Sequence, residues 1–269
     1  MRYEKIALSA TDAEVYLEAF IAEKVGNYTR KAMLVIPGGG YGGVCHDREG
    51  EPIAMAFMPY GYNAFVLHYT VARRGAFPTQ LIEAATAIKH IKDNAEAYNI
   101  APDQLFTVGF SAGGHLAACT GTLWKHPAIR EALDMPYGYN KPTGTMLIYP
   151  VIGDHAFTFR NLWWTDTPTE EQLDMVRLEK HVDADTAPVF MMHTANDQEV
   201  NVKNALTYAS ALSAAGHKYE MHIYPDAPHG IALGNDITEC NFPGWKNESI
   251  AEWVRLAAKW AESVVPTER

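Results

Sequence analysis

Apolar positions along the chain follow two different periods, which alternate. Short and nearly continuous apolar runs, typical of strands buried on both faces, occupy residues 31–36, 64–69, 105–108, 145–149, 188–193 and 219–224. Between them, apolar residues recur at helical spacing over residues 52–58, 81–98, 202–215 and 246–264. Residues 1–30 alternate more loosely and predict strands at a sheet edge. This order predicts an α/β fold, a mostly parallel central sheet with helices on both faces.

Length and composition are those of one globular domain, residues 1–269, with 48% hydrophobic and 20% charged residues. The sequence lacks an apolar run of about 18 residues and an N-terminal secretory signal, so we expect a cytoplasmic protein with no membrane partner. A net charge of -10 without clustered Lys and Arg argues against nucleic acid. Cys45, Cys119 and Cys240 are odd in number, far apart and not spaced as zinc ligands, which fits a reducing compartment.

The first chemical candidate lies between the apolar run 105–108 and a segment with helical character. Residues 109–114 read Gly-Phe-Ser-Ala-Gly-Gly, the pattern of a sharp strand-to-helix turn that lifts a serine clear of the sheet. The motif alone is weak, since it arises by chance in about one chain in ten of this length. Its position between a strand and a helix favours Ser111 as a nucleophile.

A serine hydroxyl needs a base, usually a histidine that a carboxylate orients. His229 follows the last predicted strand in a loop rich in proline and glycine, and Asp197 follows the strand 188–193. Asp226 competes as the acid, but it lies only three residues before His229 and would have difficulty reaching round the ring. The order Ser111, Asp197, His229 is the one found in hydrolases with this type of turn. His68 is one of the histidines that receive no role.

Residues 37–43, Pro-Gly-Gly-Gly-Tyr-Gly-Gly, directly follow a predicted strand. Their N–H groups are unusually accessible and suit a developing oxyanion. We expect Gly39, Gly40 and the N–H of Ala112 to form the oxyanion hole. A phosphate-binding loop is the competing interpretation, but neither the Lys-Ser/Thr pair of a P-loop nor a convincing ribose-binding acid is present.

Together, the glycine run, the turn at 109–114, Asp197 and Pro-His-Gly at 228–230 resemble the α/β-hydrolase superfamily, specifically its acetyl esterase/lipase branch. The resemblance extends from about Ala32 to Val264. Pro37 stands where lipases of this branch have the histidine of His-Gly-Gly-Gly, which is similar to bacterial esterases that remove acetyl or feruloyl groups from plant polysaccharides. The resemblance implies no metal and no organic cofactor.

Residues 154–185 form a small insertion rather than a large lid, and they contain Trp163 and Trp164. Aromatic faces stack on sugar rings, so these two tryptophans and Tyr41 of the glycine run are the candidates for substrate binding. Packing of the insertion onto the sheet would explain the same tryptophans. The sequence therefore leaves open whether they line a pocket.

The leading hypothesis is a serine carboxylesterase that removes acetyl groups from carbohydrate, such as acetylated xylo-oligosaccharides, through an acyl-enzyme. The alternatives are a feruloyl or aryl esterase and an arylformamidase-like hydrolase. A non-catalytic binding protein on the same fold would have lost part of the triad, whereas this chain has all three candidates. The expected partner is a small-molecule or oligosaccharide ester, and the fold is compatible with a homodimer.

Overall fold

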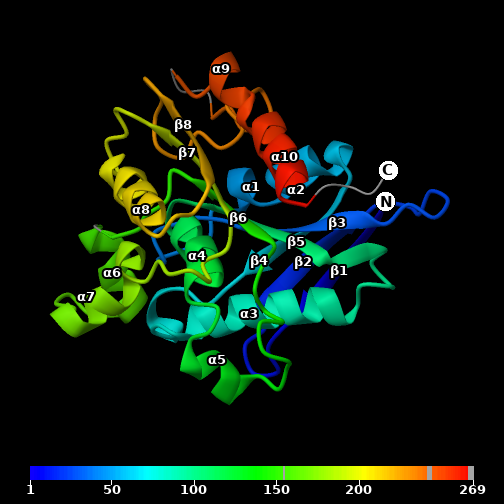
Figure 1. Ribbon diagram of the computed structural model, residues 1–269, viewed down its shortest axis with the longest axis horizontal. Coiled ribbons are helices and arrows are strands. Elements are labelled where there is room, and N and C mark those ends of the chain that lie inside the picture. The colour runs from blue at the N-terminus through cyan, green and yellow to red at the C-terminus, as the bar shows by residue number, and fades with distance from the viewer. Residues whose placement is uncertain (154, 241–243, 266–269) are drawn as a thin grey trace.

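The computed structural model describes residues 1–153, 155–240 and 244–265. Its central sheet has the strand order β1-β2-β4-β3-β5-β6-β7-β8 (Figure 1). Strand β2 runs antiparallel to both neighbours, and every other neighbouring pair is parallel. The strands are β1 (Arg2–Ala7), β2 (Tyr16–Ile21), β3 (Arg30–Ile36), β4 (Tyr62–His68), β5 (Ile100–Phe110), β6 (Gly144–Ile148), β7 (Val189–Thr194) and β8 (Tyr219–Tyr224).

From β3 onward, helices connect successive strands, and two more follow β8 in the part of the chain that the structure describes. They are α1 (His46–Glu49), α2 (Glu51–Phe57), α3 (Thr79–Asp93), α4 (Ser111–Thr122), α5 (Pro127–Ala132), α6 (Ala156–Trp163), α7 (Glu170–Val176), α8 (Lys203–Ala214), α9 (Glu248–Ala251) and α10 (Trp253–Val264). Three short 3-10 turns are η1 (Met58–Tyr60), η2 (Ala72–Arg74) and η3 (Leu178–Lys180). Within the described ranges, no helix has the length and hydropathy needed to cross a membrane.

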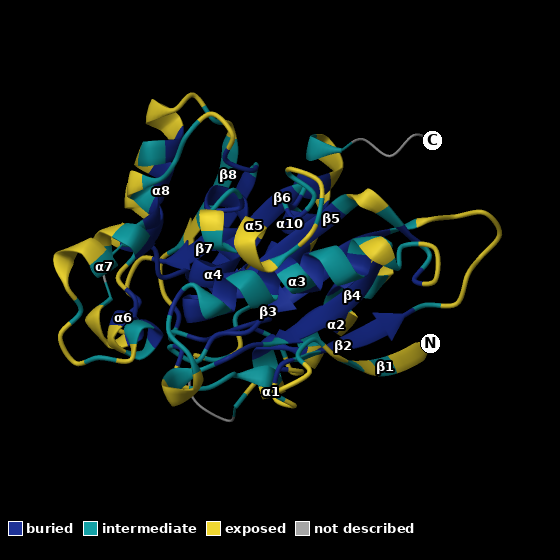
Figure 2. Cartoon of the chain, turned by 90° about the horizontal axis from the view of Figure 1, so that it is seen from below, coloured by how far each residue is buried: buried dark blue, intermediate teal, exposed yellow. Residues whose placement is uncertain are grey.

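Both faces of the sheet are covered, which explains why its inner strands are apolar at nearly every position. On one face, Leu34 and Ile36 of β3 belong to a core with residues of α3, α4 and α8. On the other face, Met33 and Val35 belong to a core with residues of α2 and α10. In Figure 2 the inner strands are dark blue, whereas β1 at the edge is yellow and teal, and helix α3 carries teal on its outer side. The predicted fold class is confirmed.

The predicted strands are confirmed to within one or two residues at most ends, and two predicted helices differ. Helix α3 ends at Asp93, and the chain from Asn94 to Asn99 forms consecutive turns, with Tyr98 N–H donating to the Asn94 carbonyl at 3.0 Å. The closing helix is interrupted at Glu252 and begins again at Trp253. Apolar spacing predicts the buried face in both cases, but it does not report where backbone hydrogen bonding stops.

The predicted insertion comprises α6, α7 and η3, between β6 and β7; Asp154, its first residue, lies outside the described residues. Helices α6 and α7 lie at the end of the molecule opposite to β1 (Figures 1 and 2). The Nε2 of His115 in α4 contacts the Val176 carbonyl oxygen at 2.8 Å, which joins the insertion to the sheet layer.

Two loops meet because of the strand order β4-β3-β5. Strand β3 lies between β4 and β5, and the chain passes from β3 to β4 and then to β5 on the other side of β3. Because β3 and β5 are parallel neighbours, the segments that follow them start side by side at the carboxyl ends of the strands. Crevices of this kind, beyond the carboxyl ends of parallel strands, are where open α/β sheets place their sites. Here the crevice brings together the glycine run and the turn that carries Ser111.

Candidate active site

Ser111 is the first residue of α4 and has a φ of 52°, in the left-handed region that side chains rarely adopt. The turn is so tight that a Cβ on Gly109 would overlap the Gly113 carbonyl, and a Cβ on Gly113 would overlap the Ile36 carbonyl. Both glycines are therefore required by close backbone approach. The strained serine at a strand-to-helix turn is the geometry of a nucleophile elbow.

Three side chains from distant parts of the chain form a hydrogen-bonded row. His229 Nε2 lies 2.8 Å from Ser111 Oγ, and His229 Nδ1 lies 2.7 Å from Asp197 Oδ2. Because a carboxylate accepts only, Nδ1 carries the proton and Nε2 is left to accept from the serine hydroxyl. This is the tautomer in which a histidine can remove the serine proton.

The Asp197 carboxylate is held in place on both oxygens. Its side chain is 0% exposed, and Oδ1 accepts the N–H groups of Glu199 and Val200, both at 2.9 Å. Burial opposes its ionisation, but the hydrogen bond and charge of His229 together with the two N–H donors outweigh burial and lower the pKa of Asp197. The competing carboxylate, Asp226, is exposed and bonds instead to the side-chain amide of Asn196.

The glycine run lies against the elbow, since a Cβ on Gly38 would be 3.0 Å from the Cβ of Ser111. Gly39 and Gly40 have φ values of 124° and 62°, and both line a cavity with Ser111 and His229. In the described part of the chain, neither N–H has a hydrogen-bond partner. By contrast, the Gly38 N–H donates to Glu49 Oε2 at 2.8 Å. The loop therefore presents free donors to the cavity while its first glycine is tied down.

The cavity beside Ser111 is small, about 160 Å³. The insertion contributes to its wall through α6 and the residue before it. Phe157 is 62% exposed, and its ring would lie 2.7 Å from a Cβ on Gly40. The lining residues are Gly39, Gly40, Cys45, Arg48, Glu49, Ser111, His155, Phe157, Thr158, Glu199, Val200 and His229.

The three predicted substrate-binding residues do not line this cavity. Tyr41 is 1% exposed, and its hydroxyl lies 2.9 Å from His115 Nδ1 in the core. Trp163 packs against Phe77, with ring centroids 5.6 Å apart. Trp164 is exposed, and its ring lies beside Arg73, with the guanidinium 5.0 Å from the ring centroid. An aromatic residue in a loop or insertion can turn to either side, and here Tyr41 and Trp163 pack against other aromatic side chains instead of lining the cavity.

Two residues of the site carried no signal in the sequence analysis. Glu49 is buried; its Oε2 accepts the Gly38 N–H, and its Oε1 accepts the Tyr149 hydroxyl at 2.9 Å. The Tyr149 ring packs against His229 with centroids 5.0 Å apart. Glu49 thus links the glycine run to the histidine of the row. A glutamate in a short charged segment gives no periodicity from which burial could be inferred.

The sheet, the elbow and the hydrogen-bonded row define an α/β-hydrolase. Residues 17–152 match the model of the BD-FAE family, and the chain belongs to that family. A solved α/β-hydrolase enzyme, MGS-M1 from a Medee basin deep-sea metagenome library, is 32% identical and covers 98% of each chain with a TM-score of 0.81.

Two curated relatives are larger proteins. Endo-1,4-beta-xylanase B of Butyrivibrio fibrisolvens is 35% identical over 86% of this chain and 37% of its own length. An acetylxylan esterase of Xylanibacter ruminicola is 26% identical over 83% of this chain and 45% of its own length. The chain therefore spans less than half the length of these relatives.

Proposed function

We propose that this chain is a serine carboxylesterase that removes acetyl groups from carbohydrate, with acetylated xylo-oligosaccharides as the expected substrates. The observation that carries the proposal is the row from Ser111 Oγ through His229 to the buried carboxylate of Asp197. Two relatives named for xylan chemistry, an endo-xylanase and an acetylxylan esterase, support the substrate class.

In the proposed reaction, Ser111 Oγ attacks the ester carbonyl while His229 Nε2 accepts the hydroxyl proton. Asp197 stabilises the imidazolium that forms and keeps the ring in its orientation. His229 then protonates the departing sugar hydroxyl, which leaves the acetyl group on Ser111. A water molecule, activated by the same histidine, attacks this acyl-enzyme and releases acetate.

The negative charge that develops on the carbonyl oxygen requires fixed donors. Gly39 and Gly40 line the cavity beside Ser111, and we assign their N–H groups, with the N–H of Ala112 at the start of α4, as the oxyanion hole. The N-terminal N–H groups of a helix lack intrahelical partners, so Ala112 is free to donate. Loss of one such donor costs about 3 kcal/mol in transition-state stabilisation.

The size of the cavity favours a short acyl group. Its volume of about 160 Å³ is below the range of about 300–1,000 Å³ that is usual for pockets that enclose a drug-sized ligand. An acetyl group fits such a space, and the sugar then lies toward the exposed Phe157 ring at the mouth. The small cavity therefore favours acetyl esters over the bulkier feruloyl esters.

The decisive experiment is acetate release from acetylated xylo-oligosaccharides, run beside p-nitrophenyl acetate, p-nitrophenyl butyrate and methyl ferulate. Ser111→Ala is the blank, and labelling of both proteins with a fluorophosphonate probe reports the nucleophile. We expect serine-dependent acetate release and labelling of the wild type alone. Equal labelling of both proteins would overturn the role of Ser111, whereas activity on aryl esters alone would overturn only the carbohydrate substrate.

A further inference from the structure

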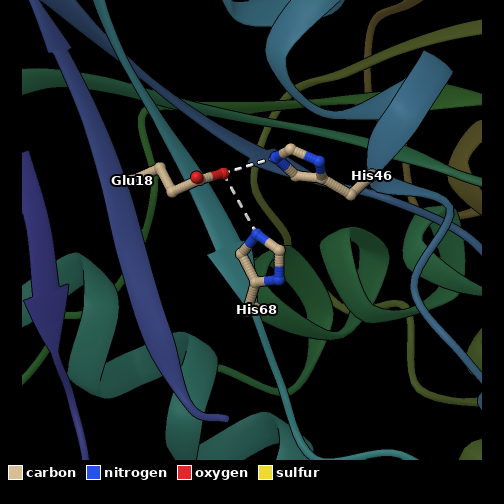
Figure 3. A group of neighbouring side chains, drawn as sticks. All are labelled: Glu18, His46 and His68. Carbon is tan, nitrogen blue, oxygen red and sulfur yellow. Dashed lines mark hydrogen bonds and ion pairs between the residues drawn. The ribbon is translucent and has the colours of Figure 1, made fainter. Parts of the chain in front are cut away.

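A second cluster of polar side chains lies outside the Ser111 cavity, on strands β2 and β4 next to the edge strand β1. Glu18 is on β2, His68 is at the end of β4, and His46 begins α1 (Figure 3). Tyr16 of β2 is directly opposite His68 in the antiparallel ladder. Because side chains alternate along a strand, Glu18 projects from the same face as Tyr16 and His68.

The two imidazoles converge on one oxygen. Figure 3 shows both rings pointing a nitrogen toward the Glu18 carboxylate, whose Oε2 contacts Nε2 of His46 and, at 3.1 Å, Nε2 of His68. One ligand atom from each residue lies within 4.8 Å of the others. Ligands of a tetrahedral zinc ion lie about 3.4 Å apart, as bonds of about 2.1 Å require. Small side-chain rotations would therefore seat an ion.

Neighbouring groups hold two of the three ligands. The Tyr3 hydroxyl donates to Glu18 Oε1 at 2.6 Å, and the Tyr16 ring stacks on His68 with centroids 4.0 Å apart. The His46 side chain is one-third exposed, which leaves a path from solvent. Fixed ligands with an outer hydrogen bond and an open side are the usual surroundings of a metal site.

The charge states also suit a cation. Burial opposes ionisation of Glu18, but hydrogen bonds from Tyr3 and His68 and the nearby His46 outweigh burial and lower the Glu18 pKa. Burial lowers the pKa of His68 more than the hydrogen bond to Glu18 raises it, which favours the neutral ring. The carboxylate is the form of Glu18 that ligates metal, and a bound ion would displace the protons with which the two Nε2 atoms contact Oε2.

We propose that Glu18, His46 and His68 bind one divalent transition-metal ion, with zinc as the best-suited ion. Two imidazoles and one carboxylate match zinc and its neighbours in the first row, whereas calcium and magnesium prefer sites built from oxygen. The ion would join α1 to strands β2 and β4. Because Glu49 at the other end of α1 accepts the Gly38 N–H, the ion would also stabilise the base of the glycine run.

The test uses the full chain, stripped with a chelator and titrated with zinc chloride in a calorimeter. We expect one saturable site, with a zinc affinity at least about 100-fold weaker in His68→Ala and in Glu18→Gln. Removing a residue that only hydrogen-bonds to a metal ligand usually weakens the affinity by about 10- to 100-fold, so a larger loss indicates a ligand. His222→Ala is the matched control, because this histidine also contacts a glutamate, Glu220 at 2.9 Å, but on β8 at the opposite edge. Equal affinity in wild type and His68→Ala would overturn the proposal.

A second measurement does not depend on the folding of variants. Crystals of the wild-type protein soaked in zinc should show an anomalous-scattering peak between the three side chains. Zinc should also raise the unfolding temperature of the wild type but not that of His46→Ala, because only the folded protein presents the assembled ligands. No peak at this place, or a peak only at another histidine, would contradict the site.

Discussion

The Asp197 carboxylate is buried in the candidate site and accepts three hydrogen bonds. It receives one hydrogen bond from His229 and two from backbone N–H groups. In Asp197→Asn the amide presents a donor to the ring and favours the wrong imidazole tautomer. We expect kcat to fall by about 10⁴-fold with little loss of stability.

Asp226→Asn is the matched control for this variant. Asp226 is exposed and three residues from His229, so its charge should contribute little to the reaction. Steady-state rates on p-nitrophenyl acetate for both variants, with circular dichroism to check folding, decide the assignment. If Asp226→Asn were the inactive protein, Asp197 would not be the acid.

Glu49 is a positioning residue rather than a catalytic one in this structure. Its two oxygens accept from Gly38 N–H and from the Tyr149 hydroxyl, and burial raises its pKa. Glu49→Gln keeps one acceptor oxygen and places an NH2 group against a donor. The free energy of unfolding should fall by about 1–3 kcal/mol, and kcat should fall by about 10- to 100-fold as the glycine run shifts.

The measurement for Glu49→Gln combines urea unfolding with separate kcat and KM values. Glu51→Gln, an exposed glutamate two residues further on, is the control and should match the wild type. A variant that loses stability but keeps the wild-type kcat would show that Glu49 supports the fold without positioning the glycine run.

At the scale of elements, helix α4 packs closely against the end of β3 and the loop after it because Gly113 has no side chain. A Cβ on Gly113 would overlap the carbonyl oxygens of Ile36 and Pro37. Gly113→Ala should therefore lower the free energy of unfolding by about 3 kcal/mol, because backbone must move on both segments. Gly43→Ala is the control, since nothing lies within 4 Å of a Cβ there. Equal urea midpoints for the two variants would contradict this account of the elbow.

At the scale of the whole molecule, the His115 side chain joins helix α4 to the glycine run and to the insertion. It lies on α4, its Nδ1 contacts the Tyr41 hydroxyl, and its Nε2 contacts the Val176 carbonyl at the end of α7. Burial lowers its pKa from 6.5 to about 4. Between pH 6.5 and about pH 4, His115 is therefore protonated in the unfolded chain and neutral in the folded chain.

The sign of this linkage gives a prediction. The stability contributed by a neutral His115 is present above pH 6.5 and is lost as the pH falls toward 4. In His115→Gln the fall in unfolding free energy between pH 6.5 and 5 should be shallower by up to about 1.4 kcal/mol per pH unit. Urea titrations at several pH values measure the slope. Thr120→Ser, at a buried residue of the same helix without charge, should keep the wild-type slope. An unchanged slope in His115→Gln would refute the prediction.

The sequence alone determined the order of strands and helices, because hydrophobic period and turn chemistry act over a few residues. Strands 31–36 and 105–108 were recognisable from apolar runs, and the turn at 109–114 from its glycines. Ser111, Asp197 and His229 could be proposed together since each follows a strand, and parallel strands end at one edge. The structure brings these three side chains into contact.

Only the tertiary structure decided which side chains face the cavity. Tyr41 turns into the core toward His115, whereas Phe157, rather than either tryptophan of the insertion, reaches the cavity wall. Glu49 and the group formed by Glu18, His46 and His68 are equally invisible in the sequence. Their partners come from segments far apart in the chain, so strand register and packing, not local pattern, set their contacts.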